Sequence, residues 1–218
     1  MAGKFIVLEG IEGVPLEGLA GALTTALMEK GLPRAQIHLT REPSDGPIGR
    51  DIRLALRGRL QLDARTLAVL FAADRLDHLR VEESGIEARL GREQWVICDR
   101  YYLSHYAFQT YQGFDLAWLR SLNQHCRRPD LIFYIELPIA ACISNFIGQQ
   151  RMRGFHYTLA PDAEKTDEVD AYLKAIQSHY QKVIEELKGE EPIVTIKAHT
   201  EKQALGKMLR EIEQRRWL

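Results

Sequence analysis

A glycine-rich segment follows the first apolar run of the chain and has the outline of a phosphate-binding loop. The run Phe5–Glu9 leads into Gly10-Ile11-Glu12-Gly13-Val14-Pro15-Leu16-Glu17-Gly18. In the pattern G-x-x-x-x-G-K-[ST], backbone N–H groups and a lysine hold phosphates, and a hydroxyl ligates Mg²⁺. Gly10 occupies the first glycine of this pattern, but Pro15, Leu16 and Glu17 replace the glycine, the lysine and the hydroxyl residue.

Each replacement weakens a phosphate site. Pro15 has no N–H to donate, and Leu16 carries no charge. Glu17 brings a carboxylate toward an anionic ligand, and two like charges about 4 Å apart repel by roughly 4 kcal/mol at an effective dielectric constant near 20. We therefore expect ATP to bind poorly. The alternative is a tight strand–helix turn, in which Gly10 and Gly13 supply only backbone freedom.

Three further segments carry residues suited to binding a nucleotide. They read Thr40-Arg41-Glu42-Pro43-Ser44-Asp45-Gly46-Pro47-Ile48-Gly49, then Leu70-Phe71-Ala72-Ala73-Asp74-Arg75, and then Asp99-Arg100-Tyr101 with Ser104, Phe108 and Gln109 beyond it. Arginine forks bind phosphate groups, and Phe71 and Arg75 lie one helical turn apart on one face. Taken singly, Phe71 could be core, Arg75 could pair with Asp74 or Asp77, and Arg100 could be a surface cation.

In this combination and spacing, from about residue 4 to residue 145, the sequence closely resembles the bacterial and archaeal thymidylate kinases, with a degenerate Walker A loop. The resemblance implies a nucleoside monophosphate kinase that transfers the γ-phosphoryl group of ATP to dTMP, with Mg²⁺, for dTDP and dTTP biosynthesis. It also implies a homodimer, for which the apolar stretch from Leu67 to Leu79 is suitable. A buried helix within one chain would give the same pattern.

The resemblance also implies roles for individual residues. Arg100 matches the arginine on the dTMP phosphate and Arg41 a second cation there, while Phe71 stacks on the base and Arg75 contacts the thymine edge. Phe108 matches a residue against the sugar, where tyrosine is commoner. The remaining matches are Ser104 and Gln109 near the substrate, Glu12 in place of a catalytic aspartate, and Asp99 as the acidic group supporting Mg²⁺.

An irregular segment, about 148–162, is predicted to be a flexible lid. It contains Arg151 and Arg153, which match lid arginines that stabilise the transferring phosphoryl group. The family's Asp-Arg-x-x-Glu pattern is not evident here, and a polar surface loop is the alternative.

Short apolar runs that alternate with helical patterns predict how these residues are positioned. We expect one domain over 1–218, an α/β P-loop kinase sandwich of three layers with a five-stranded parallel sheet. In such sheets ligands bind beyond the carboxyl ends of the strands. The predicted strands are 4–9, 36–41, 94–99, 131–136 and 193–197. The predicted helices are 16–30, 47–57, 64–90, 103–111, 116–125, 139–147, 163–187 and 201–215, with Asp63 and Asp115 as N-caps and Gly31 ending the first.

The charge balance, the apolar runs and the cysteines limit the classes of partner and the cellular compartment to be expected. The formal net charge is −1, from 29 basic and 30 acidic residues, which gives no reason to expect nucleic acid or an anionic membrane as partner. No apolar run is long enough for a membrane span. Cys98, Cys126 and Cys142 have no paired or metal-type spacing, so we expect reduced thiols in a cytoplasmic protein.

Two functions remain open from the sequence. One is a dTMP kinase that still turns over with its divergent loop, slowly. The other is a pseudokinase that binds dTMP as a regulatory or nucleotide-binding protein without phosphorylating it. A kinase for another monophosphate, or one with another donor, is a third possibility.

Overall fold

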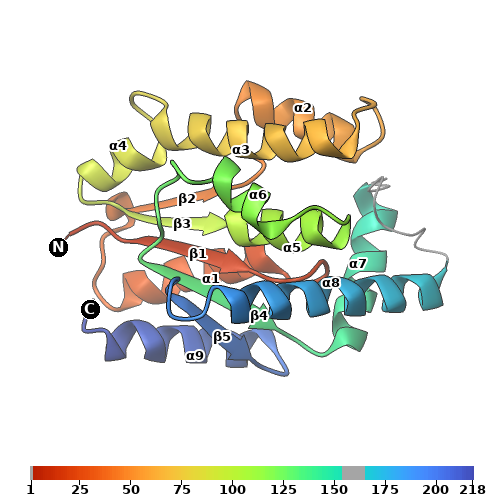
Figure 1. The fold of residues 1–218 in the computed structure, drawn as a ribbon. Helices are drawn as coiled ribbons and strands as arrows, with labels where there is room; N and C mark the ends of the chain where they lie inside the picture. Colours follow the sequence, from red (N-terminus) through yellow and green to blue (C-terminus); the bar gives the residue numbers. More distant parts are fainter. Residues whose placement is uncertain (1, 154–164) are drawn as a thin grey trace.

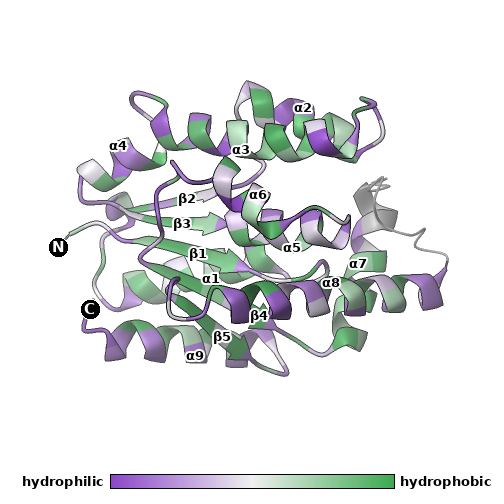
Figure 2. Cartoon of the chain, viewed as in Figure 1, coloured by the Kyte–Doolittle hydropathy of each residue, from purple (hydrophilic) through white to green (hydrophobic). Residues whose placement is uncertain are grey.

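Five short apolar segments form one parallel sheet in the computed structural model, which describes residues 2–153 and 165–218, without the side chains of 150–153. The spatial order of the strands is β2-β3-β1-β4-β5. The central strands are buried on both faces (Figure 2), which explains their continuous hydrophobicity. All five predicted strands are confirmed to within one residue: β1 Phe5–Glu9, β2 Ile37–Arg41, β3 Trp95–Asp99, β4 Leu131–Glu136 and β5 Ile193–Lys197.

Helices cover both faces of this sheet, so the predicted three-layer α/β fold is confirmed (Figure 1). Helices α5 and α8 pack together over one face, and α1 and α9 pack together over the other. The bounds are α1 Leu16–Glu29, α2 Pro47–Leu56, α3 Ala64–Arg80, α4 Ile86–Gly91, α5 Tyr102–Tyr111, α6 Leu116–Leu122, α7 Ile139–Arg153, α8 Thr166–Glu186 and α9 Glu201–Gln214.

The predicted helix ends have the expected chemistry. The Asp63 carboxylate accepts hydrogen bonds from the backbone N–H groups of Arg65 and Thr66, and Asp115 accepts one from Trp118. Gly31 adopts φ +97° directly after the C-cap of α1, a conformation that favours glycine. These caps fix where α1, α3 and α6 begin or end.

Two helix predictions are wrong in their extent. The helix predicted over 64–90 is two helices, because the backbone leaves the helical conformation at Val81 (ψ 123°) and α4 begins only after Gly85, where a Cβ would lie 2.7 Å from the carbonyl oxygens of Leu79 and Val81. Helix α7 runs to Arg153, so residues 148–153 are helical and not the start of a loop. The segment 149–153 (Gln-Gln-Arg-Met-Arg) consists of good helix formers that continue α7. Residues 154–162 of the predicted lid lie outside the described residues.

A smaller difference occurs at the C-terminal end of α6, whereas the cysteines are as predicted. Helix α6 ends at Leu122 and not at residue 125, because the Asn123 side chain donates to the carbonyl of Leu119 and so competes with helix bonding. Cys98, Cys126 and Cys142 are all free thiols. Over residues 2–153 and 165–218, no helix combines the length and apolarity that a membrane crossing requires.

The turn from β1 into α1 is closed over by α7. Gly13 has φ +83°, and a Cβ at this position would overlap the carbonyl group of Cys142. The Asn145 amide donates to the Gly13 carbonyl at 2.9 Å. The turn is therefore held in one conformation from the side on which α7 lies.

We expect Gly13→Ala to lower the free energy of unfolding by about 2 kcal/mol or more, because alanine at positive φ is strained and its methyl group meets backbone atoms. Gly21→Ala is the matched control: Gly21 lies within α1 with nothing near its absent Cβ, so this change should stabilise by up to about 1 kcal/mol. Urea unfolding of both variants measures the difference. Equal stabilities would contradict the packing of the turn.

Candidate functional site

A cavity of about 230 Å³ opens beyond the carboxyl ends of the strands, where the sequence places its functional residues. Residues at the ends of β2 and β3 meet there with side chains from α1, α3, α5 and the β1–α1 turn. The predicted residues that line it are Glu12, Glu17, Arg41, Phe71, Arg75, Asp99, Arg100, Ser104, Phe108 and Gln109. Ten residues from four separate segments are thus brought together.

Arg100 is the principal cation of the cavity and is not a surface residue. Its backbone has φ +67°, an uncommon conformation for a residue other than glycine. Its Nη1 donates to the Gly10 carbonyl at 2.8 Å, to Ser104 Oγ at 3.0 Å and to the Tyr180 hydroxyl at 3.2 Å. Nε and Nη2 make no hydrogen bond to another described residue. That edge of the guanidinium is left for a ligand.

Arg75 forms a buried wall of the cavity, and its side chain is only 1% exposed. Nη2 donates to Glu42 Oε2 at 2.6 Å, and Nη1 donates to Asn123 Oδ1 at 2.5 Å. The alternative that Arg75 pairs with Asp74 on a solvated face is wrong, since Asp74 accepts from Ser44. Its charge is neutralised by Glu42, and Nε remains buried without a hydrogen-bond partner.

Aromatic and amide groups line the end of the cavity next to Arg75. The Phe71 ring lies 5.6 Å from the ring of His105. Gln109 is 1% exposed, and its Oε1 has no hydrogen-bond partner. A flat ring beside an unpaired acceptor and an unpaired Arg75 Nε suits a planar ligand that carries both donors and acceptors.

The protonation state of His105 follows from its neighbours. Its Nδ1 lies 3.2 Å from Asn123 Nδ2 and 3.4 Å from Arg75 Nη1, and both of these groups are donors. Nδ1 must therefore be an acceptor, which leaves the single proton of a neutral imidazole on Nε2. Burial and the nearby Arg75 charge lower the pKa of His105 well below its ordinary value.

Carboxylates crowd the opposite end of the cavity. Burial raises the pKa of Asp99, the Arg100 charge lowers it, and the Glu17 carboxylate raises it further. Burial likewise raises the pKa of Glu12, which accepts a 2.7 Å hydrogen bond from Tyr172. Glu17 stands in the first turn of α1. Of the described residues that line this end, three are carboxylates, Glu12, Glu17 and Asp99, and two are cations, Arg41 and Arg100.

Asp99 Oδ1 and Glu12 Oε2 are both buried without a hydrogen-bond partner. Mg²⁺ prefers oxygen ligands and is commonly held by one or two carboxylates together with substrate phosphates. The described residues contain no group of three or more potential ligands arranged around one point. The donors thus fit a Mg²⁺ ion shared with a bound phosphate, to which Asp99 and Glu12 would each offer one oxygen.

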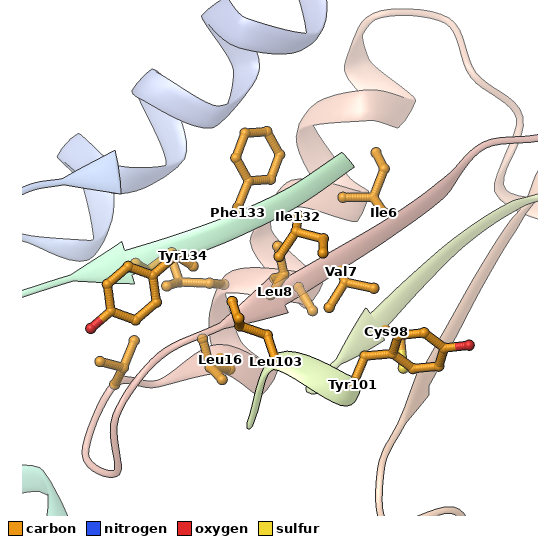
Figure 3. Packing of buried hydrophobic residues seen from close by; sticks show 14 of the residues in the cluster. Ile6, Val7, Leu8, Leu16, Cys98, Tyr101, Leu103, Ile132, Phe133 and Tyr134 are labelled. Atoms are coloured by element: carbon orange, nitrogen blue, oxygen red, sulfur yellow. The ribbon is translucent and has the colours of Figure 1, made fainter. Parts of the chain in front are cut away.

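The β1–α1 turn does not have the form of an open phosphate cradle. Leu16 is 3% exposed and lies among buried side chains such as Leu8 and Leu103 (Figure 3). The N–H of Val14 donates to Ile11 O at 3.3 Å, and the N–H of Leu16 donates to Val14 O at 2.9 Å. With Pro15 lacking an N–H, the three consecutive positions 14, 15 and 16 have no free donor for a phosphate.

The sequence predictions overlooked a buried network beneath Arg100. Glu9, at the end of β1, is fully buried and accepts from Tyr101 N at 2.9 Å, Ser104 N at 3.1 Å, the Tyr180 hydroxyl at 3.2 Å and the Ser104 hydroxyl. Burial raises the pKa of Glu9 to about 7. A charged residue closing an apolar strand was a usable signal for Glu9. No local motif marks Tyr172 or Tyr180 in the last third of the chain.

Several predicted residues lie outside the cavity wall. Gly10 contributes only its carbonyl, to Arg100 and Tyr180, and Gly18 is exposed in α1. The side chains of Arg151 and Arg153 lie outside the described residues. Also overlooked were further lining residues, of which Glu42, Pro43, Tyr101 and His105 lie inside or next to the quoted motifs, whereas Leu56 and Tyr172 do not.

Comparisons with known proteins show the family and the fold of the chain. The family model described as "Thymidylate kinase" matches residues 8–209. A probable thymidylate kinase of Pyrococcus horikoshii is 38% identical over 144 residues, covering 64% of this chain and 67% of that protein. One of Staphylothermus marinus is 35% identical over 178 residues, covering 82% of this chain and 80% of that protein.

Among solved structures, a thymidylate kinase from Candida albicans superimposes with a TM-score of 0.74 at 19% identity. The superposition covers 99% of this chain and 93% of that one, and so supports the fold. Because the family model spans nearly the whole chain and these relatives are 35% and 38% identical to it over the aligned residues, this chain belongs to the thymidylate kinase family.

Proposed function

We propose that the protein binds dTMP, or a closely related nucleoside monophosphate, in the cavity that Arg100 lines. The free edge of Arg100, together with Arg41, suits a phosphate at one end. Phe71 and Gln109 suit a flat base at the other end. Gln109 Oε1 can accept from the N3–H of thymine, and Arg75 Nε can donate to a ring carbonyl. The open cation at Arg100 is the observation that carries the proposal.

The second part of the proposal is that transfer from ATP is impaired. In this family Mg²⁺ neutralises charge on the transferring phosphoryl group, and Asp99 would hold it here. The buried Leu16 supplies no charge to the β- and γ-phosphates, and the amides of Val14 and Leu16 are already bonded within the turn. Glu17 adds a negative charge to the cavity wall. The β1–α1 turn, where ATP would bind, therefore repels phosphate groups, whereas the Arg100 end of the cavity attracts the phosphate of dTMP.

The second candidate function is a dTMP-binding protein without kinase activity. It is favoured by the same closed turn, because α7 packs on Gly13 and leaves the turn little room to open. The two candidates share the acceptor site and differ only in turnover. Lid arginines at 151 and 153 remain part of the first proposal. Three free cysteines support a reducing compartment such as the cytoplasm for either one.

Calorimetric titration tests the acceptor site directly. The wild-type protein should bind dTMP, and Arg100→Ala should weaken binding at least tenfold, since a charge-assisted bond to phosphate contributes about 1.5–3 kcal/mol. Arg120→Ala is the matched control, because Arg120 pairs with Glu190 at an exposed site. Unchanged dTMP affinity in Arg100→Ala, or an equal loss in the control, would contradict the assignment.

Restoring the loop tests the donor side. The triple variant Pro15→Gly, Leu16→Lys, Glu17→Ser recreates the full phosphate-loop pattern, and we expect it to form ADP from ATP, Mg²⁺ and dTMP at least tenfold faster than wild type. The same variant with Arg100→Ala is the control and should lose this gain. Wild-type turnover as fast as that of the repaired protein would refute impaired ATP use. Wild-type turnover of zero would favour the binding protein over the slow kinase.

A homodimer through α3 is also part of the proposal. Within the Leu67–Leu79 stretch, Val69 is 44% exposed, whereas Leu67, Ala68, Ala72 and Leu79 are buried within the chain. We expect sedimentation to give twice the chain mass of 25.0 kDa, and Val69→Glu to give the single-chain mass, because a buried unpaired carboxylate opposes association. The same mass for both proteins would exclude an α3 interface centred on Val69.

A further inference from the structure

Tyr180 reaches from α8 to the point where the turns after β1 and β3 meet. Its side chain is fully buried, and its ring stacks on Tyr134 with centroids 4.9 Å apart and lies edge-on to Phe108 at 6.1 Å. The hydroxyl lies 2.7 Å from Ser104 Oγ, 3.1 Å from the Gly10 carbonyl and 3.2 Å from both Glu9 Oε2 and Arg100 Nη1. One hydroxyl thus meets four polar partners.

The proton count of this cluster fixes which partner donates to Tyr180 and that Ser104 donates to Glu9. Arg100 Nη1 is a donor only, so Tyr180 accepts from it. The Ser104 hydroxyl lies against Glu9 Oε2 and donates to it. The single Tyr180 proton then goes to the Gly10 carbonyl, to Glu9 or to Ser104. Arg100 Nη1 has two protons for three acceptors, so that nitrogen is fully engaged by the protein.

We propose that Tyr180 is a positioning residue, which turns the Nη1 corner of Arg100 into the protein and thereby presents the Nε and Nη2 edge to the ligand phosphate. The inference rests on the proposed binding of a nucleoside monophosphate in this cavity. An arginine side chain has several rotatable bonds, and holding it in the bound geometry before the ligand arrives raises affinity. Three acceptors around one nitrogen provide that restraint, and Tyr180 is the one that comes from α8.

The same helix also contacts the other side of the cavity. Tyr172 lies two helical turns before Tyr180 and donates to Glu12 Oε1 at 2.7 Å. A single rigid helix therefore holds both the phosphate-facing arginine and the carboxylate of the β1–α1 turn. This makes α8 the element that couples the acceptor end to the turn.

Tyr180→Phe removes only the hydroxyl, and comparing dTMP with thymidine isolates the phosphate. We expect Tyr180→Phe to weaken dTMP binding about tenfold, which is about 1.4 kcal/mol, and to leave thymidine affinity within about twofold. Ser104→Ala should give the same phosphate-selective loss, since Ser104 also restrains Nη1. Tyr134→Phe is the matched control, because the Tyr134 hydroxyl is buried in the same ring stack without a hydrogen-bond partner.

Three outcomes would overturn the inference. Wild-type dTMP affinity in Tyr180→Phe would show that the hydroxyl positions nothing, while the proposed function would stand. Equal losses for dTMP and thymidine, with a lower melting temperature, would make Tyr180 structural only. Failure of the wild-type protein to bind either ligand would overturn the proposed function together with the inference.

Discussion

The 2.8 Å hydrogen bond from Arg100 to the Gly10 carbonyl joins the turn after β1 to the turn after β3, and the candidate site is organised around it. Adjacent parallel strands bring these turns to one edge of the sheet. At this point the Arg100 backbone adopts a left-handed conformation, which costs conformational free energy. Below it, Glu9 accepts from the first turn of α5 and so fixes that helix against β1. The cation, the carbonyl and the buried carboxylate hold one another in place.

The two ends of the cavity have different electrostatic character because different segments build them. At the Arg75 end, the arginine is paired with the buried Glu42, and Gln109 Oε1 and Arg75 Nε are buried without hydrogen-bond partners near the Phe71 ring. Among the described residues around Arg100, three carboxylates and two arginines line the cavity. An anionic group placed there gains from Arg100 and Arg41 but meets Glu12, Glu17 and Asp99. A cation such as Mg²⁺ would relieve that repulsion, so phosphate and metal affinities should depend on each other.

The sequence allowed much of this to be predicted, because strand periodicity and cap chemistry are local. The five strands and the Asp63 and Asp115 caps needed only neighbouring residues. The break between α3 and α4 was missed because the sequence around Gly85 continues a helical pattern. A glycine in such a pattern does not reveal whether its backbone lies close to other carbonyl groups. Tyr180 and Tyr172 were missed because their partners lie about 160 to 171 residues away, at Glu9 and Glu12. Such contacts depend on how α8 packs against the rest of the fold, and the spacing of residues along the sequence does not predict that packing.

If ATP use is impaired as proposed, the packing of this turn stabilises the fold at the expense of phosphate binding. A buried leucine side chain stabilises a fold by about 1.5–3 kcal/mol, and Leu16 is as buried as the strand residues around it. A lysine in the same place would bring a charge into the core unless the turn opened. Opening is resisted by the contacts of Cys142 and Asn145 with Gly13. The proline, the leucine and the α7 contacts therefore support one another. In this turn a gain in ATP binding requires the loss of apolar packing that now closes the core above β1.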